Sequence, residues 1–286
     1  MTRASPRQLI REGTERLGGD PASRRFSELL LSELLSVGRT ALYLEEKDLS
    51  EEAAHRFFRL LEGVQEGKPF QYLLGKAAFM GEPFQVTPDC FIPRVETELL
   101  VEACLDYFNE RQPLLLMDIG TGSGCIAISL TKRLTYSNML AIDLMEEALR
   151  IARQNGQFHR VTERISWICG DLFSPLRKGM EADAILSNPP YIPSGEIASL
   201  PPEVQKEPHL SLDGGASGLD YYRRLVKESP SFLKGGGLLF FEIGDHQKDP
   251  ILEICSGSPF HLVEVREDIC GRPRVMIFRK KAALHG

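Results

Sequence analysis

The chain has 286 residues, of which 42% are hydrophobic and 26% are charged. At roughly 150 residues per domain, this length predicts about two domains with a buried core. The composition excludes a disordered or fibrous protein. The net charge of −6 argues against a surface built mainly to bind nucleic-acid phosphates.

The cysteines are scattered along the chain, at Cys90, Cys104, Cys125, Cys169, Cys255 and Cys270. No pair has the spacing of a zinc or redox motif, so we expect no metal site and interpret these residues as buried small hydrophobes. The start of the chain lacks the apolar stretch of a signal peptide, and no apolar run is long enough to span a membrane. We therefore expect a cytoplasmic enzyme or binding protein.

The first third of the chain predicts helices. Ser5, Asp20 and Ser50 each precede a segment with helical periodicity and can cap its amino end. In the second segment, one face is expected to carry Phe26, Leu29, Leu30, Leu34 and Val37. These helices either form a bundle that only stabilises the chain or bind a partner, and their residues favour neither interpretation.

The rest of the chain predicts strands and helices in alternation. From Gly75 to Pro93, glycines and prolines break short apolar runs, which predicts a strand-turn-strand connector. The alternation that follows predicts a parallel sheet with helices on both faces. The expected strands are 114–119, 139–142, 165–168, 184–186 and 238–243, the expected helices are 98–108, 125–134 and 145–155, and strands near 261–265 and 275–278 are expected to form an antiparallel edge hairpin.

A glycine-rich loop follows the predicted strand 114–119. It consists of Gly120, Thr121, Gly122, Ser123 and Gly124 and leads into a helix. Glycines let the backbone turn sharply and approach a ligand closely, and the helix start offers free N–H groups. The spacing is Gly-x-Gly-x-Gly, which differs from the Gly-x-Gly-x-x-Gly of dinucleotide-binding loops.

Two further strand ends point to a nucleoside site. Asp143 closes the next strand, where a carboxylate can accept hydrogen bonds from both ribose hydroxyls. A third strand is followed by Asp171, Leu172 and Phe173, a polar group and apolar side chains where an adenine ring would lie. Either carboxylate alone could be a helix cap. Together the three strand ends resemble the S-adenosylmethionine site of class I methyltransferases.

The fourth strand is followed by Asn188, Pro189, Pro190 and Tyr191. A planar NH2 group is a poor nucleophile because its lone pair is delocalised, so a site must orient it. The Asn188 side-chain oxygen and the Pro189 carbonyl can accept hydrogen bonds from its two N–H groups. The adjacent prolines hold these two acceptors in place with little loss of conformational entropy, and Tyr191 can stack on the substrate. A Pro-Pro turn without function is the alternative. Nucleic-acid adenine methyltransferases use a similar tetrapeptide.

Residues 67–75 (Gly-Lys-Pro-Phe-Gln-Tyr-Leu-Leu-Gly) and 91–102 (Phe-Ile-Pro-Arg-Val-Glu-Thr-Glu-Leu-Leu-Val-Glu) resemble the peptide chain release factor glutamine methyltransferases, the PrmC/HemK family. The resemblance covers almost the whole chain. Val95 stands where the family usually has proline, and Leu172 where many relatives have an aromatic residue. Further short segments occur in the same order along the chain as in that family: Glu207-Pro208, Gly214-Gly215, Gly218-Leu219, Gly235-Gly236-Gly237, Glu242-Ile243-Gly244 and 268–274.

The resemblance implies a Rossmann-like α/β fold, a class I S-adenosylmethionine-dependent methyltransferase domain at 97–286. It also implies a helical substrate-binding domain at 1–74 and a β-hairpin linker at 75–96. The implied reaction is N5-methylation of the glutamine in the Gly-Gly-Gln motif of class I release factors, with S-adenosylhomocysteine as the other product. The helices would help to hold the factor, and we expect a monomer with no nucleic-acid substrate and no membrane partner.

The family's functional residues map onto matching positions of this sequence. The cofactor would contact Gly120, Thr121, Gly122, Ser123, Gly124, Asp143, Asp171, Leu172 and Asn188. The substrate glutamine would be held by Asn188, Pro189, Pro190 and Tyr191, with Asn188, Pro189 and Tyr191 as the catalytic residues. Phe173 is an alternative to Leu172 for the adenine contact. Arg94 either steers an acidic partner or pairs with Glu96 or Glu98, and Glu242 either orients the site or caps a helix.

Four alternative functions are compatible with parts of the sequence. They are methylation of a ribosomal-protein glutamine, methylation of a nucleic-acid amino group, nucleotide-dependent oxidation such as an oxidase step in haem synthesis, and non-catalytic binding of a translation factor. The net negative charge and the predicted helices in the first third of the chain weigh against a nucleic-acid substrate. The glycine spacing and the lack of a redox cysteine pair weigh against the oxidoreductase. The intact sequence from Asn188 to Tyr191 weighs against the binder.

Overall fold

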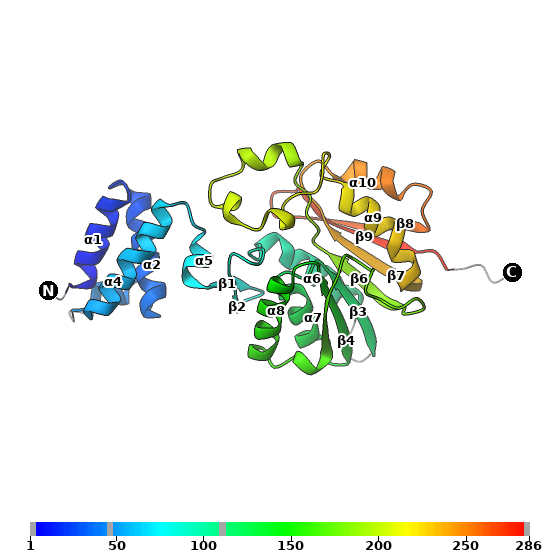
Figure 1. Cartoon of the computed structure of the whole chain (residues 1–286), viewed down its shortest axis with the longest axis horizontal. Helices are drawn as coiled ribbons and strands as arrows, with labels where there is room; N and C mark the ends of the chain where they lie inside the picture. Colours follow the sequence, from blue (N-terminus) through cyan, green and yellow to red (C-terminus); the bar gives the residue numbers. More distant parts are fainter. Residues whose placement is uncertain (1–3, 45–47, 109–112, 283–286) are drawn as a thin grey trace. The chain divides into compact units, whose positions relative to one another are not determined.

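The computed structural model describes residues 4–44, 48–108 and 113–282. The chain divides into two compact units (Figure 1). The first consists of Met1–Gly75 and Pro202–Lys206, and the second of Lys76–Pro201 and Glu207–Gly286. The first is helical, and the second is built around a β-sheet.

Side-chain caps begin the long helices of the first unit. Ser5 and Gln8 form a reciprocal capping box, Asp20 Oδ1 accepts from the backbone N–H of Ser23, and Ser50 Oγ accepts from that of Ala53. The three caps expected from the sequence are therefore confirmed. The helices are α1 (Pro6–Arg16), α2 (Pro21–Leu35), α3 (Ala41–Leu44), α4 (Glu51–Gln65) and α5 (Phe70–Leu74), with a 3-10 turn at Val204–Lys206.

The helices of the first unit pack around a small apolar core. Its buried side chains are Leu9, Ile10, Leu30, Leu31, Leu42, Phe57 and Leu61. Leu29 is 39% exposed, so its predicted place on the inner face is wrong. The buried stripe of α2 passes through Leu30 and Leu31 instead, because 100° per residue turns Leu29 away from them.

The second unit contains a two-stranded hairpin and a seven-stranded sheet. The sheet order is β5-β4-β3-β6-β7-β9-β8, parallel from β5 to β7, with β9 and β8 antiparallel at the edge. The strands are β1 (Lys76–Phe79), β2 (Glu82–Gln85), β3 (Leu114–Ile119), β4 (Ser137–Asp143), β5 (Ile165–Cys169), β6 (Ala182–Ser187), β7 (Leu233–Glu242), β8 (Phe260–Glu267) and β9 (Pro273–Lys280). This confirms the predicted parallel sheet and its antiparallel edge hairpin.

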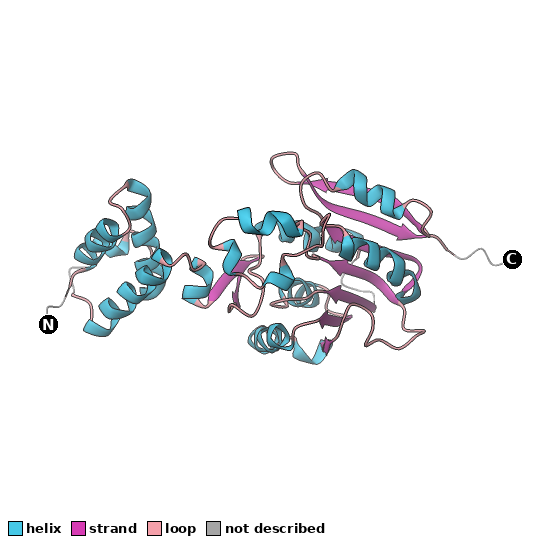
Figure 2. Cartoon of the chain, turned by 45° about the horizontal axis from the view of Figure 1, so that its top comes forward, coloured by secondary structure: helices cyan, strands magenta, loops and turns pink. Residues whose placement is uncertain are grey.

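Helices cover both faces of the sheet (Figures 1 and 2). Alternate strand residues face opposite layers: Leu116 belongs to the apolar layer that includes residues of α6 and α7, whereas Met117 belongs to the layer that includes residues of α9 and α10. The helices are α6 (Val95–Tyr107), α7 (Cys125–Arg133), α8 (Glu146–Phe158), α9 (Asp220–Glu228) and α10 (Lys248–Cys255), with 3-10 turns at Thr162–Arg164, Ser194–Ser199, His209–Ser211 and Ser229–Phe232. The sequence pattern did not identify α9 and α10.

The β1–β2 hairpin belongs to the core of the second unit. Phe79 and Phe84 are buried in the layer that contains α6 and α7. Asn155 of α8 is fully buried and pairs with both backbone groups of Gln85: its Oδ1 accepts from N–H at 2.7 Å and its Nδ2 donates to the carbonyl at 3.0 Å. The hairpin is thereby fixed to the helix that follows β4.

The cysteines divide by burial. Cys90, Cys104, Cys125 and Cys255 are buried, as predicted, and burial raises the pKa of the Cys90 thiol to about 11. Cys169 and Cys270 are exposed, so the prediction of buried small hydrophobes is wrong for these two. Both lie where the chain leaves the sheet, at the end of β5 and between β8 and β9, where few side chains cover them.

Candidate functional site

The sheet brings the predicted residues to one edge. The carboxyl ends of β3, β4, β5 and β6 lie side by side because these strands are parallel neighbours. Ser187 Oγ at the end of β6 donates to the carbonyl of Ile119 at the end of β3, at 2.7 Å. A Cβ on Gly120 would lie 4.0 Å from the backbone oxygen of Asn188, so the glycine loop and the segment after β6 are close neighbours.

The glycine loop requires glycine at particular positions. Gly120, Gly122 and Gly124 have φ values of +77°, +55° and +81°, in the left-handed region that favours glycine. A Cβ on Gly124 would lie 3.1 Å from atoms of three side chains, whereas a Cβ on Gly122 would meet nothing within 4 Å. One side of the loop is therefore packed, and the backbone at Gly122 faces open space.

Asp118 holds the glycine loop through hydrogen bonds, a role that was not predicted from the sequence. Its Oδ2 accepts from Thr121 Oγ1 at 2.6 Å and from the backbone N–H of Ala127 at 3.2 Å. Burial raises the pKa of Asp118 to about 7, although both hydrogen bonds lower it. The signal for this residue was an aspartate in the interior of an otherwise apolar strand.

Asp143 joins β4 to the glycine loop. Its Oδ2 accepts from the backbone N–H of Gly122 at 2.7 Å, and its Oδ1 accepts from that of Met145 at 2.9 Å. Burial raises the pKa of this carboxyl, and the backbone hydrogen bonds oppose the rise. Each carboxylate oxygen has a second lone pair, so Asp143 can accept further hydrogen bonds beside Gly122.

The end of β5 carries the residues expected near an adenine ring. Asp171 forms an ion pair with Arg224 of α9 at 2.9 Å, and both side chains are about half exposed. Leu172 is buried with φ +49°, a conformation that costs a leucine free energy and that the surrounding packing must hold. Phe173 stacks on Phe232 with ring centroids 5.0 Å apart and is 2% exposed. Its ring is part of the apolar core of the second unit.

The segment from Asn188 to Tyr191 follows β6 at the same edge, and we call it the acceptor loop. Asn188 Nδ2 donates to Thr97 Oγ1 at 3.1 Å. Thr97 is buried in the first turn of α6 and orients the Asn188 amide so that Oδ1 is the end left to accept other donors. Pro189 is buried, and burial raises the pKa of Tyr191.

Glu242 lies beneath the acceptor loop. It is the last residue of β7 and is 2% exposed, and burial raises its pKa to about 7, while Thr97 and Asn188 beside it lower the pKa. The helix-cap interpretation is wrong, because α10 begins after Gln247, five positions further along. Glu242 therefore belongs to the polar surroundings of Asn188.

Arg94 has a different partner from those expected. It forms an ion pair with Glu207 rather than with Glu96 or Glu98, and its guanidinium lies 4.8 Å from the ring centre of Phe91. Glu207 is 5% exposed and also accepts from the backbone N–H of Ile92 at 3.2 Å. Arg94 thus compensates a buried carboxylate, a role that ties the start of α6 to the segment before Pro208.

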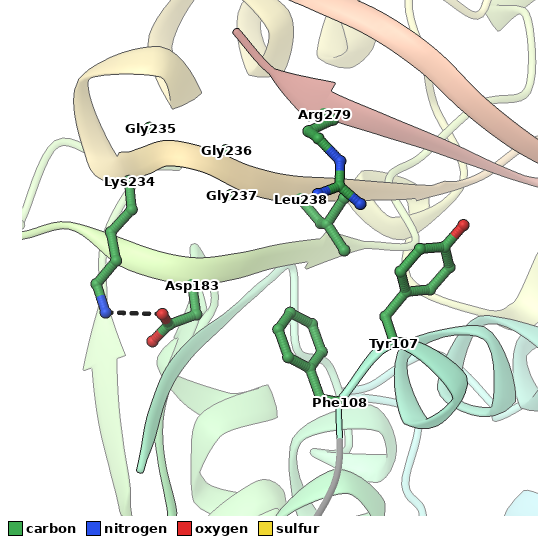
Figure 3. Close-up of a pocket in the computed structure, with 9 residues that line it drawn as sticks. All are labelled: Tyr107, Phe108, Asp183, Lys234, Gly235, Gly236, Gly237, Leu238 and Arg279. Carbon is green, nitrogen blue, oxygen red and sulfur yellow. Dashed lines mark hydrogen bonds and ion pairs between the residues drawn. The ribbon is translucent and has the colours of Figure 1, made fainter. Parts of the chain in front are cut away.

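A pocket of about 220 Å³ lies at the opposite end of the sheet. Figure 3 shows Lys234 and Asp183, at the starts of β7 and β6, joined by an ion pair of 2.7 Å across one side of it. The other lining residues are Tyr107, Phe108, Gly235, Gly236, Gly237, Leu238 and Arg279. None of them belongs to the predicted site.

Two features are absent from the described part of the chain. No group of three or more His, Cys, Asp or Glu residues there is placed to hold a metal ion. No helix in residues 4–44, 48–108 and 113–282 combines the length and the apolar composition needed to cross a bilayer.

The chain is similar to known methyltransferases over most of its length. Residues 8–75 match the PrmC N-terminal domain, and residues 96–199 match the methyltransferase small domain. A release factor glutamine methyltransferase of Moorella thermoacetica is 38% identical, over 95% of this chain and 97% of that protein. Its counterpart in Thermodesulfovibrio yellowstonii is 34% identical, over 91% of this chain and 94% of that protein.

Solved structures support the fold. A methyltransferase from Pyrococcus furiosus matches with a TM-score of 0.54 at 18% identity, over 71% of this chain and 91% of that chain. The predicted α/β methyltransferase fold is thereby confirmed. The similarity in sequence, sustained through both the helical region and the sheet, shows that the chain belongs to the family of release factor glutamine methyltransferases.

Proposed function

We propose that the protein transfers a methyl group from S-adenosylmethionine to the side-chain amide nitrogen of the glutamine in the Gly-Gly-Gln motif of class I release factors. The observation that carries this proposal is the orientation of Asn188. Its Nδ2 is engaged by Thr97, which leaves Oδ1 to accept a substrate N–H beside the glycine loop. The relatives named for release factor glutamine methylation support the choice of substrate.

The residues around the glycine loop fit the proposed cofactor. The open side at Gly122 gives a ligand access to the backbone, and the Asp143 carboxylate beside it can accept from ribose hydroxyls. Leu172 would pack against the adenine ring. Asp171, which forms an ion pair with Arg224, would contact the ring from the same strand end. When bound, S-adenosylmethionine supplies an electrophilic methyl group.

The acceptor loop would prepare the substrate amide. Asn188 Oδ1 and the carbonyl of Pro189 would accept hydrogen bonds from the two N–H groups of the amide. These bonds would direct the amide nitrogen toward the methyl group and limit its rotation. Tyr191 would pack against the planar amide, and Pro190 would restrict the backbone between them. Methylation makes the nitrogen much more acidic, so its proton can leave afterwards without a strong general base.

We further propose a division of labour along the chain. The helices of residues 1–74 would hold the release factor, residues 75–96 would link them to the sheet, and residues 97–286 would carry out methyl transfer. The PrmC N-terminal match at 8–75 supports the first assignment. Because the proposed substrate is a translation factor, the cytoplasm is the proposed place of action.

The test is a labelling experiment. Methyl-labelled S-adenosylmethionine is incubated with the protein and a purified class I release factor, beside a factor whose motif is changed to Gly-Gly-Ala, and mass spectrometry locates the label. We expect label on the wild-type glutamine alone. Label on neither factor, with measurable cofactor binding, would overturn the proposed substrate. Parallel incubations with ribosomal protein and with nucleic acid would then identify the alternative.

A further inference from the structure

Gln247 lies between β7 and α10, and both ends of its side-chain amide are hydrogen-bonded. The residue is 9% exposed. Its Nε2 donates to the carbonyls of Tyr191 at 2.9 Å and Gly218 at 3.1 Å. Its Oε1 accepts from the backbone N–H of Gly244 at 2.9 Å. The Tyr222 hydroxyl, which donates to the Glu242 carbonyl at 2.8 Å, lies 3.4 Å from this oxygen. One amide thus uses both of its donors and accepts one hydrogen bond, at the backbones of Tyr191, Gly218 and Gly244.

Three glycines let these segments approach the acceptor loop. A Cβ on Gly214 would lie 2.8 Å from Tyr191 Cα, and one on Gly244 would lie 2.9 Å from Tyr191 Cδ2. A Cβ on Gly218 would collide with the Tyr191 carbonyl oxygen, the atom to which Gln247 donates. The glycines at these places are needed because backbone and ring atoms of Tyr191 occupy the space that any side chain would require.

The loop's own sequence does not fix this carbonyl. The two prolines restrict φ at positions 189 and 190 but do not restrict the peptide plane after Tyr191, which contacts from outside the loop must hold. The Tyr191 carbonyl and the Ile192 N–H form one peptide unit, whose N–H donates to the Leu212 carbonyl at 3.0 Å, and Gly214 N–H donates to the next carbonyl, that of Ile192, at 2.8 Å. Gln247 supplies the hydrogen bond on the carbonyl side of that peptide unit, so the unit is held at both of its polar groups.

We propose that Gln247 is a positioning residue for methyl transfer, acting through the Tyr191 carbonyl to hold the acceptor loop in its substrate-binding conformation. This inference rests on the proposed function. Gln247 makes none of its hydrogen bonds to the glycine loop or to Asp143. Its loss should therefore impair the use of the substrate amide and leave cofactor affinity nearly unchanged.

The decisive variant is Gln247→Glu, which keeps the size of the side chain and replaces the two N–H donors with an oxygen. At neutral pH that oxygen would face two carbonyls, and at low pH a protonated carboxyl would restore one donor. We expect kcat to fall at least about tenfold, with the Kd for S-adenosylmethionine within about twofold of wild type. We also expect the ratio of variant to wild-type kcat to rise as the pH is lowered.

Two further variants guard against trivial explanations. Gln157→Glu makes the same chemical change on the exposed surface of α8 and should leave both quantities unchanged. Gln247→Met removes the hydrogen bonds without adding a charge, and it should lower kcat at all pH values alike. Thermal unfolding with and without cofactor checks that each variant is folded. Equal proportional losses in kcat and cofactor affinity would overturn the inference, as would an unchanged kcat.

A second readout does not depend on the substrate. Amide hydrogen exchange is measured on the full-length protein for peptides that contain Ile192 and Gly214 and for a peptide that contains residues 120–124. In Gln247→Glu we expect faster exchange in the first two only. Unchanged exchange there would overturn the inference even if the wild-type enzyme fails to methylate release factors, an outcome that would contradict the proposed function separately.

Discussion

Two loops meet at the same edge of the sheet and are built in different ways. The glycine loop contains its own glycines, and three of its five residues have positive φ. The acceptor loop contains two prolines and no glycine, and the glycines that it needs lie in the segments packed on it, at Gly214, Gly218 and Gly244. A tight conformation can therefore be encoded in a loop or in its neighbours, and only the first is visible as a compact motif.

The two loops also differ in what fixes them. Carboxylates from two strands, Asp118 within β3 and Asp143 at the end of β4, hold the glycine loop through hydroxyl and backbone N–H groups. A hydroxyl and a side-chain amide, from Thr97 and Gln247, hold the acceptor loop. Because the two sets share no residue, cofactor binding and amide orientation should respond separately to mutation.

The largest expected effect comes from Asn188→Ala. The change removes the oxygen proposed to accept a substrate N–H, so we expect kcat to fall about 100-fold or more while the Kd for S-adenosylmethionine changes only slightly. Steady-state kinetics and titration calorimetry measure the two quantities. Thr97→Val is the comparison variant, because it keeps the Asn188 oxygen and removes the hydroxyl to which the Asn188 amide donates, and it should have a smaller effect. Equal losses in rate and affinity would contradict the separation of the two loops.

Asp143→Ala tests the other loop. It removes a carboxylate that accepts from Gly122 N–H and, as proposed, from the ribose, so we expect cofactor affinity to fall about 10- to 100-fold, the range for hydrogen bonds to a charged group. At saturating cofactor, kcat should fall much less. Asp143→Asn retains one acceptor oxygen, so its cofactor affinity should lie between those of wild type and Asp143→Ala. A wild-type affinity in Asp143→Ala would remove this residue from the cofactor site.

Local patterns predicted most of the sheet and the glycine loop. The β3 boundaries and the position of Asp143 follow from a buried apolar run and the residue that ends the next one. The helices α9 and α10 were missed because they lie after irregular segments whose structure depends on the sheet. Strand ends are set by short-range periodicity, whereas these helices are placed by packing.

The partners of site residues could not be predicted, because they are distant in sequence. Arg94 pairs with Glu207, 113 positions away, rather than with the acids of its own helix. Gln247 reaches Tyr191 over 56 positions. Glycines at 214, 218 and 244 were visible as part of a family resemblance, but their reason is a contact with one residue, which only the fold reveals.

Glu242 provides a smaller test, through the pH dependence of stability. Burial raises its folded-state pKa from 4.5 to about 7, so the folded protein binds more protons than the unfolded chain in that interval. Its contribution to the free energy of unfolding is thus fully present below pH 4.5 and is lost as the pH rises through about 7. Glu242→Gln should therefore gain stability relative to wild type, by about 1–3 kcal/mol, between pH 5 and pH 8.

Urea unfolding of both proteins across this range measures the difference. The comparison with wild type is needed because Asp118, beneath the other loop, also has a raised pKa and contributes in the same direction in both proteins. Parallel pH profiles would show that Glu242 does not titrate in this interval. A steeper decline in the variant would contradict the sign of the shift.

The smallest expected effect is a gain in stability from Val95→Pro, at the start of the helix that carries Thr97. Val95 is the first residue of α6 and is 71% exposed, and Arg94 before it has φ −105° and ψ 151°, the extended conformation that a following proline requires. Proline should thus fit without strain and raise the free energy of unfolding by about 0.4–1 kcal/mol through the unfolded state.

Activity sharpens this last prediction. Thr97 holds the Asn188 amide from the first turn of α6, so a distorted helix start would lower kcat before it affected cofactor affinity. We expect kcat within about twofold of wild type, because the backbone already has the conformation that proline needs. Val95→Ala, which changes the side chain without constraining the backbone, is the control. A stabilised variant with reduced kcat would show that the acceptor loop depends on freedom in this turn, whereas unchanged kcat shows that the turn already holds Thr97 in place.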